Sequence, residues 1–357
     1  MVQRRNVPKN EGIATLGAEA YIYLMIGFRY LLAFLLPASV YFGLLSQGPL
    51  SFAALVFAFG LVPFFEGILP TAASNLTDSE RSKVLSQSHY DLFVLMQIPL
   101  HLGAIALFIA VVPQDRSSGD MVSLLGHMTA LGISCGTLAI NVAHELGHRP
   151  QAAYQRLAQG LLVSSLYGQF FIDHNFGHHK HVGTPEDSST ARHGEVLYLF
   201  WIRSIVGVWR TAWRLKPRLM AVMFVAEVLY LSLVFALAPE ALLPLVLSSF
   251  FGILLLETVN YIEHYGLTRV KVTEHRYENT EPQHSWNSNH PLGRFMLFEL
   301  TRHSDHHANP YRPFPLMNHY DESPQMPAGY PAMMMLAVVP PLWFRVMNPR
   351  LKPSASY

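Results

Sequence analysis

Apolar residues are concentrated in long stretches that polar links separate. A helix that crosses the ~30 Å hydrocarbon core of a bilayer needs ~20 predominantly apolar residues. Six stretches meet this requirement, and they predict membrane spans at about residues 20–45, 50–69, 92–112, 122–143, 219–237 and 242–261. They pair into three hairpins, because the links at 46–49, 113–121 and 238–241 are short. The pattern therefore predicts an all-α integral membrane protein with six transmembrane helices in a single membrane-embedded domain.

Three further segments lie on the polar side of these predicted hairpins. Residues 71–90 form a polar loop in which a short helix is predicted from Asp78. Residues 151–171 are amphipathic, which predicts a helix packed beneath the bundle or lying at the membrane interface. Residues 330–346 are apolar but contain two consecutive prolines, and we interpret them as an interfacial or re-entrant piece.

Composition agrees with a membrane protein. Hydrophobic residues make up 51% of the 357-residue chain and charged residues only 14%, against ~25% charged residues in soluble proteins. The formal net charge of +1 gives no basis for binding nucleic acid. The single cysteine, Cys135, excludes internal disulfides, a cysteine-ligated iron–sulfur cluster and a fused rubredoxin-like site. An electron donor must therefore be a separate protein.

Basic residues predict the orientation of the spans. Of the 25 lysines and arginines, only Arg116 lies in an outer link and only Arg29 lies within a span. Because positive charge collects in cytoplasmic loops, we expect both termini and the segments 144–218 and 262–357 on the cytoplasmic side. The first apolar stretch follows basic residues without a small-residue cleavage site, so we expect a retained helix rather than a signal peptide.

Histidines gather in these cytoplasmic segments and at the ends of two spans. Nine of them form four clusters: His144 and His148; His174, His178 and His179; His264; and His303, His306 and His307. Spacings of three and four residues place imidazoles on one face of a helix. Imidazole is the commonest protein ligand for metals and suits iron, zinc and copper. Nine imidazoles are too many for one ion, which indicates two metals.

Other metal-dependent functions fit part of this pattern. The first cluster matches the HExxH motif of zinc proteases, in which Glu145 would be the general base. A zinc protease needs only one further ligand, so the other three clusters favour a larger site. A metal transporter or sensor would place polar ligands near the bilayer midplane, whereas these ligands gather at one end of the predicted bundle.

Three segments carry a resemblance to a known family. Residues 260–266 read NYIEHYG, residues 284–290 read HSWNSNH, and residues 302–310 read RHSDHHANP. With the cluster spacings, they resemble the bacterial membrane alkane 1-monooxygenases (alkane ω-hydroxylases), within the di-iron superfamily of membrane fatty-acid desaturases and hydroxylases. Asp173 departs from this pattern, because the family usually has a glutamate before the second cluster.

The resemblance implies two non-heme iron ions held by all nine histidines. It implies hydroxylation of the terminal methyl group of medium-chain n-alkanes to primary alcohols with O2, in a bacterial inner membrane. Electrons would come from NADH through a rubredoxin reductase and a rubredoxin. Basic residues of 210–218 either attract an acidic rubredoxin or only anchor the membrane orientation. Xylene side-chain monooxygenases and fatty-acid desaturases share similar clusters, so methyl-arenes and fatty acyl chains stay open as substrates.

Acidic residues near the clusters are candidates to orient metal-bound imidazoles through the second ring nitrogen. The expected set is Asp187, Glu263, Glu281 and Asp305. A second set of ionisable residues falls within the predicted spans, where pairing inside the bundle is the simplest expectation and a role near the site stays open. This second set is Arg29, Glu66, His101, His127, Glu227 and Glu257.

Overall fold

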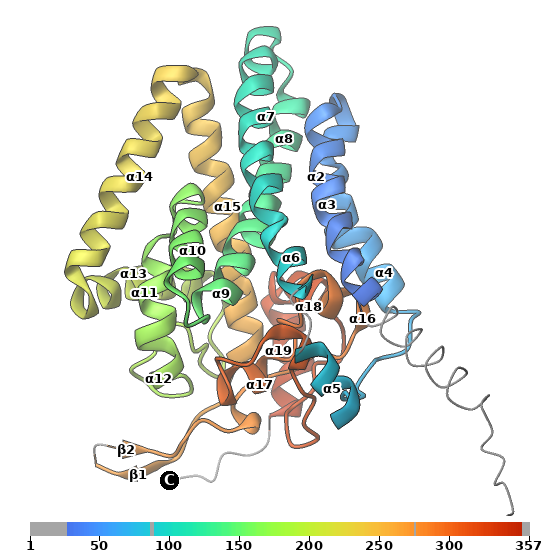
Figure 1. Cartoon of the computed structure of the whole chain (residues 1–357), viewed down its shortest axis with the longest axis vertical. Helices are drawn as coiled ribbons and strands as arrows, with labels where there is room; N and C mark the ends of the chain where they lie inside the picture. Colours follow the sequence, from blue (N-terminus) through green and yellow to red (C-terminus); the bar gives the residue numbers. More distant parts are fainter. Residues whose placement is uncertain (1–26, 86–88, 275, 352–357) are drawn as a thin grey trace, which may run out of the picture.

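Long helices form the upper part of the computed structural model, which describes residues 27–85, 89–274 and 276–351. Five helices in this described part are long and apolar enough to cross a membrane: Gly48–Glu66, Tyr90–Ser118, Met121–Gly147, Pro217–Leu237 and Pro239–His264. A shorter apolar helix, Arg29–Leu45, stands beside them (Figure 1). The predicted multi-pass, all-α architecture is thus confirmed.

The predicted number of six spans stays a prediction. The first predicted span, 20–45, is described only from residue 27, and the basic residues expected before it lie outside the described residues. The other five predicted spans each coincide with one long helix. The second was predicted too long, because its helix ends at Glu66.

The bundle consists of three neighbouring pairs of helices. In blue, on the right of Figure 1, η1 (Arg29–Phe34) and α2 (Leu35–Leu45) lie beside η2 (Gly48–Phe52), α3 (Ala53–Val56), η3 (Phe57–Leu61) and α4 (Val62–Glu66). The central pair comprises α6 (His89–Leu95), α7 (Gln97–Ser118), α8 (Met121–Ser134), η4 (Cys135–Ile140) and α9 (Asn141–Gly147). The left-hand pair is α14 (Pro217–Leu237) and α15 (Pro239–His264). Of these elements, η3 and η4 are π-helices, a rare form that is frequent at functional sites.

Turn chemistry explains the tight connection between α7 and α8. Gly119 has a φ of 72° and ends α7 in the left-handed conformation that glycine adopts without strain. Asp120 then caps α8, because its carboxylate accepts the backbone N–H of Ser123 at 3.0 Å. Pro113 lies inside α7 and does not end it, so the link is shorter than the sequence predicted.

The remaining elements lie around and below the lower end of the bundle (Figure 1). Before α6 there is α5 (Asp78–Leu85). Between α9 and α14 the chain forms α10 (Ala152–Ser164), α11 (Gln169–Asp173), η5 (His174–His178), α12 (His179–His181) and α13 (Leu197–Leu215). After α15 come the antiparallel β1 (Lys271–Thr273) and β2 (Arg276–Tyr277), then η6 (Pro282–His284), α16 (Pro291–Met296), α17 (His303–Ala308), η7 (Phe314–Leu316), α18 (Tyr330–Ala337), α19 (Pro340–Met347) and η8 (Asn348–Arg350).

These shorter elements agree with the sequence in part. The helix predicted from Asp78 is present as α5. The single helix predicted over 151–171 is wrong, because α10 ends at Ser164 and Leu166 takes a φ of 57° before α11 begins. Residues 330–346 are helical as α18 and α19, and their place at the membrane interface stays a prediction. The sequence analysis missed α13, a 19-residue helix with one buried face.

The histidine clusters all come to the lower end of the bundle. Helix α9, the last part of one membrane-length helix, and helix α15 each carry a histidine near their end. The short helices α12 and α17 lie below them in Figure 1. Helices that begin far apart in the sequence therefore converge on one place.

Candidate metal centre

The nine predicted histidines form two compact groups. His144, His148, His174, His179 and His306 form one, which we call group one. His178, His264, His303 and His307 form the other, called group two. Within each group, the candidate ligand atoms all lie within 4.8 Å of one another. The arrangement matches the expectation of two metals.

Ring Nε2 atoms converge at the centre of group one. The Nε2 atom of His306 lies 2.9 Å from that of His144 and 3.0 Å from that of His179. The Nε2 atom of His174 lies 3.0 Å from those of His148 and His179. Five nitrogen atoms directed at one small volume are the arrangement that a bound cation requires.

In group two, four imidazoles face one another in the same way. The Nε2 atom of His303 lies 3.0 Å from that of His264 and 2.9 Å from that of His307. His178 completes the group, and its buried Nε2 has no hydrogen-bond partner. The two groups touch, because the ring centroids of His179 and His307 are 4.6 Å apart. Metals bound in both groups would be close neighbours.

Local backbone geometry decides which histidine joins which group. His303 and His307, four residues apart on α17, lie in group two, whereas His306 lies in group one. The segment η5 is a π-helix, so His174 shares group one with His179, five residues later, and not with His178. The rings of His303 and His306 are nevertheless stacked 5.5 Å apart and those of His174 and His178 5.3 Å apart, as expected for side chains on one face, so each pair contributes one ring to each group.

Burial favours the neutral form of most of the candidate ligand imidazoles. It lowers the pKa of His148 to about 3, with a smaller contribution from the neighbouring His178. Burial, followed by repulsion from nearby imidazoles, also places the pKa values of His306 and His307 well below the usual value. A neutral imidazole has a lone pair on one ring nitrogen, which is the form that binds metal.

An apolar cavity lies between the spans next to group one. Its volume is about 90 Å³, and its wall is almost entirely apolar. Its walls come from η3, η4, α15, α16 and α18, and include Ala58, Gly136, Val259 and Met334. The two π-helices of the bundle thus both line this cavity.

A smaller cavity lies between the apolar cavity and the histidines of group one. Its volume is about 10 Å³, and it is lined by His144 and His306. Asn141, Leu297 and Leu300 line both cavities. These three residues therefore form the boundary between an apolar space and the candidate metal site.

Comparison with known proteins decides the family. Residues 121–337 match the fatty acid desaturase family. The chain is 37% identical over 335 residues to alkane 1-monooxygenase 2 of Pseudomonas aeruginosa, covering 89% of each chain. It is 35% identical over 309 residues to the alkane 1-monooxygenase of Acinetobacter baylyi, covering 82% of this chain and 74% of the relative. The chain belongs to the alkane 1-monooxygenase family.

A further relative of this alkane 1-monooxygenase family member has a different name. The xylene/toluene monooxygenase hydroxylase component of Pseudomonas putida is 30% identical over 286 residues, covering 73% of this chain and 74% of the relative. The resemblance to the alkane 1-monooxygenase family, which the sequence motifs indicated, is thus confirmed.

Two of the four expected carboxylates contact group two. Asp187 is buried, and its Oδ2 lies 2.9 Å from Nδ1 of His178. Although burial opposes both effects, this pairing raises the pKa of His178 and lowers that of Asp187. Glu263 is also buried, and its Oε1 lies 3.3 Å from Nδ1 of His303 without a hydrogen bond to it, while it accepts the hydroxyl of Tyr330 at 2.7 Å. The hydrogen bond between His178 and Asp187 is of the kind that fixes the orientation of a ligand imidazole.

The other two expected carboxylates lie elsewhere. Asp305 is fully buried, but it accepts hydrogen bonds from Arg312, Tyr320 and Asn309 and has none from a histidine. Glu281 is exposed, and it caps the short helix η6. The structure therefore brings Asp187 and Glu263, but not Asp305 and Glu281, to the imidazoles.

The departure at Asp173 places a short carboxylate in a closed environment. Asp173 is buried in front of the second histidine cluster. Burial, together with the nearby negative charge of Asp187, raises the pKa of Asp173 to about 8. The carboxyl is therefore protonated at neutral pH.

The six ionisable residues of the predicted spans each have a hydrogen-bond or ionic partner. The ring of His101 is hydrogen-bonded to the hydroxyls of Ser134 and Ser164. The ring of His127 is hydrogen-bonded to Asp115 and to the carbonyl of Ser46. Glu227 accepts the backbone N–H of Gly168, and Glu257 accepts the hydroxyl of Tyr167. Glu66 accepts the N–H of Gly293, and Arg29 lies 3.9 Å from Glu299. Pairing inside the bundle holds for His127, whereas the partners of Glu66, Glu227, Glu257 and Arg29 lie in the segments outside the spans.

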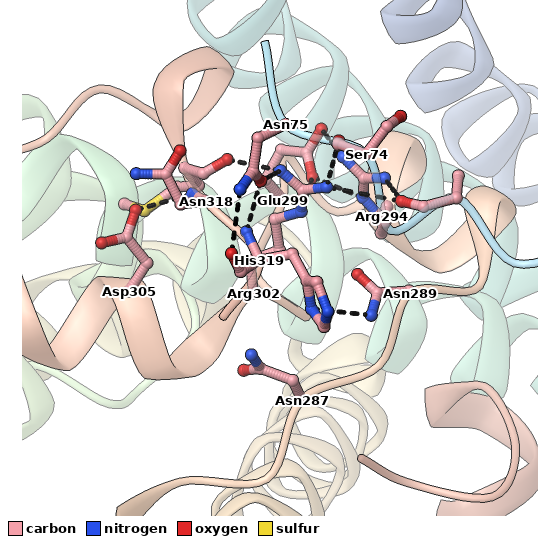
Figure 2. A network of polar contacts seen from close by, with 12 residues as sticks. Ser74, Asn75, Asn287, Asn289, Arg294, Glu299, Arg302, Asp305, Asn318 and His319 are labelled. Atoms are coloured by element: carbon pink, nitrogen blue, oxygen red, sulfur yellow. Dashed lines mark hydrogen bonds and ion pairs between the residues drawn. The ribbon is translucent and has the colours of Figure 1, made fainter. Parts of the chain in front are cut away.

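A buried ion cluster next to the site was missed by the sequence analysis. Oε2 of Glu299 lies 2.7 Å from Nε of Arg294 and 3.6 Å from Nε of Arg302 (Figure 2). All three side chains are almost completely buried. Arg302 directly precedes α17 and donates to the carbonyl oxygens of Met317 and Ser74. The only signal in the sequence was an arginine inside the third recognised motif. The cluster attaches the metal-site helix α17 to the loop after α4.

Proposed function

We propose that this protein is a non-heme di-iron monooxygenase that hydroxylates the terminal methyl group of medium-chain n-alkanes. One observation carries the proposal: two adjacent imidazole groups lie beside a small cavity that adjoins an apolar cavity among membrane-length helices. The family relationship supports the same reaction, since two relatives reported above bear the name alkane 1-monooxygenase.

The donor atoms fit two iron ions. Neutral nitrogen ligands suit iron, and both groups offer several imidazoles whose Nε2 atoms face one another rather than separate partners. The buried Nδ1–carboxylate contact at His178 would orient this ligand. Iron bound there would supply the O2 activation that attack on an unactivated C–H bond requires.

The protein itself positions the substrate and excludes water. An apolar wall binds an alkyl chain without hydrogen bonds, and the cavity narrows at Asn141, Leu297 and Leu300 before the imidazoles. A chain held in this cavity presents an end, and not its middle, to group one, which is a positioning effect. Overall, the alkane, O2, NADH and a proton give the primary alcohol, water and NAD⁺.

Electron supply and membrane orientation complete the proposal. With one cysteine in the chain, the electrons would come from a separate rubredoxin that an NADH-dependent reductase reduces. Four exposed basic residues at the junction of α13 and α14 would face the cytoplasm of a bacterial inner membrane: Arg210, Arg214, Lys216 and Arg218. Both termini would then be cytoplasmic, and residues 1–357 would form a single catalytic domain.

The geometry disfavours the protease. Glu145, the base that the HExxH motif would use, forms an ion pair with Arg149, with Oε1 2.7 Å from Nη2. Both histidines of the motif already belong to a five-imidazole group. A methyl-arene substrate is favoured by one observation, the 30% identity to a xylene/toluene monooxygenase component.

The experiment is metal analysis of detergent-purified protein, combined with NADH-dependent conversion of octane in the presence of rubredoxin and its reductase. We expect about two irons per chain and 1-octanol as the product. Two irons with oxidation of p-xylene but not octane would favour the second substrate class. One zinc per chain without any oxidation would overturn the proposal in favour of hydrolysis.

A further inference from the structure

The turn between the two cavities has an unusual backbone. Among the described residues, only Leu166, Phe298 and Glu299 are non-glycine residues with positive φ. Two of these three are consecutive, at 53° and 59°, and lie between Leu297 and Leu300. Side chains other than glycine rarely adopt this conformation, and it persists only where surrounding contacts enforce it. We call residues 297–300 the partition turn.

The partition turn separates the apolar cavity from group one. Leu297 and Leu300 line both cavities, and Phe298 and Glu299 line the smaller one, on the side of His144 and His306. The side chain of Asn141, two turns before the end of its span, donates to the carbonyl of Leu297 at 3.3 Å. A shift of this turn would therefore change the distance that the end of an alkyl chain can travel toward the imidazoles.

Glu299 is the contact point that enforces this conformation. Its carboxylate receives Nε of Arg294 at 2.7 Å, Nη2 of the same guanidinium at 3.0 Å, and the hydroxyl of Tyr30 at 3.0 Å. Its backbone N–H donates to the carbonyl of Arg294 at 2.6 Å, and its carbonyl accepts the N–H of Arg302 at 2.9 Å. The side chain and both peptide groups of one residue are thus all engaged.

The partners of Glu299 attach the turn to two distant parts of the chain and to the neighbouring helix α17. Tyr30 belongs to η1, at the start of the first described helix. The guanidinium groups of Arg294 and Arg302 extend to the carbonyls of Ala72 and Ser74 in the loop after α4 (Figure 2). Arg302 is also the residue before α17, which carries three candidate ligands. The same carboxylate therefore links the cavity wall, the membrane spans and the metal-site helix.

We infer that Glu299 is a positioning residue that sets the regioselectivity of the reaction by fixing the partition turn. The inference rests on the proposed function. Glu299 lines only the smaller cavity and acts through Leu297 and Leu300, which limit the approach of the chain end to group one. A fixed turn admits the terminal carbon alone, whereas a loosened turn lets the second carbon reach the same position.

The test compares product ratios at equal iron content. Glu299→Gln keeps the size of the side chain and removes its charge, and Tyr30→Phe removes only one hydroxyl that donates to Glu299. The matched control is Glu227→Gln, a buried carboxylate that accepts a backbone N–H from Gly168 and lines neither cavity. Each variant is assayed with octane, and the ratio of 2-octanol to 1-octanol and the alcohol formed per NADH are measured.

We expect the share of 2-octanol to rise about tenfold or more in Glu299→Gln and less in Tyr30→Phe, with less alcohol formed per NADH. A displacement of ~1 Å at a reacting centre changes rates by roughly 10²-fold, so shifts of this size fit a small movement of the turn. The control should keep the wild-type ratio. A merely structural role would lower stability and total activity without changing the ratio.

An unchanged ratio in Glu299→Gln at wild-type iron content would overturn the inference. If Glu299→Gln does not fold, the ratio in Tyr30→Phe decides, and a wild-type ratio there would overturn it. A wild-type protein that forms no alcohol at all would instead remove the proposed function and the inference with it. The wild-type arm therefore separates the two failures.

Discussion

Asp187 offers a test of whether the two histidine groups are independent metal sites. Its carboxylate contacts Nδ1 of His178 in group two at 2.9 Å and accepts the hydroxyl of Thr190 at 2.6 Å, all in a buried environment. With a proton fixed on Nδ1, the lone pair of His178 stays on Nε2, the atom that faces the other three imidazoles. Asp187→Asn keeps the volume but removes the negative charge and replaces one acceptor oxygen by an NH2 donor.

The expected effect is a selective loss of one metal. Removing such a partner typically lowers metal affinity by 10- to 100-fold, which corresponds to about 1.4–2.8 kcal/mol. Group one contains no ligand bonded to Asp187, so its metal should stay. Iron per chain should therefore fall from about two toward one at limiting iron, and cobalt titration should resolve one weakened and one unchanged site.

Glu281→Gln is the matched control for this variant. Glu281 was also a candidate near the site in the sequence, but its side chain is exposed and caps η6. It should leave both sites at wild-type affinity. If Asp187→Asn keeps two irons per chain with unchanged affinity, the assignment of Asp187 to the support of group two is incorrect.

Three further predictions follow from the same geometry. His306→Ala and His307→Ala, adjacent in sequence, should each remove a different metal, and removal of the same site by both, seen in cobalt spectra, would contradict the division into two groups. Ala58→Trp should fill the end of the apolar cavity away from group one and shorten the longest alkane oxidised, as product profiles over a chain-length series would show. The metal-free protein should lose stability as pH falls from about 6.5 toward about 3, because His148 and other buried imidazoles are neutral when folded but protonated when unfolded. His148→Asn should make this pH dependence shallower in thermal unfolding, and an unchanged slope would show that His148 is not buried as a neutral ring.

Sequence patterns predicted the membrane helices and the candidate ligands because the forces that determine them act locally. A run of apolar residues must form a helix in lipid, since every backbone polar group has to be bonded within its own segment. The five long helices therefore coincide with predicted spans. The nine histidines could be selected from the sequence because their spacing and motifs are properties of short segments.

Other features depended on contacts between distant segments. Asp187 and Asp305 were equally favoured from the sequence, yet only Asp187 packs against an imidazole, because the loop after α12 folds back over His178. The Glu299 cluster joins residues more than 200 positions apart, and its only local signal was one arginine in a motif. No local rule predicts which buried charges will meet.

The sequence by itself determined that this chain spans a membrane, which residues can bind metal, and that they gather at one end of the helices. Only the tertiary structure decided that neighbouring His178 and His179 serve different groups, and that a turn at Leu297–Leu300 stands between those groups and an apolar cavity. The physical reason is that helix periodicity fixes the direction of a side chain only relative to its own axis. The π-helical backbone of η5 and the packing of four separate segments then determine what each side chain meets.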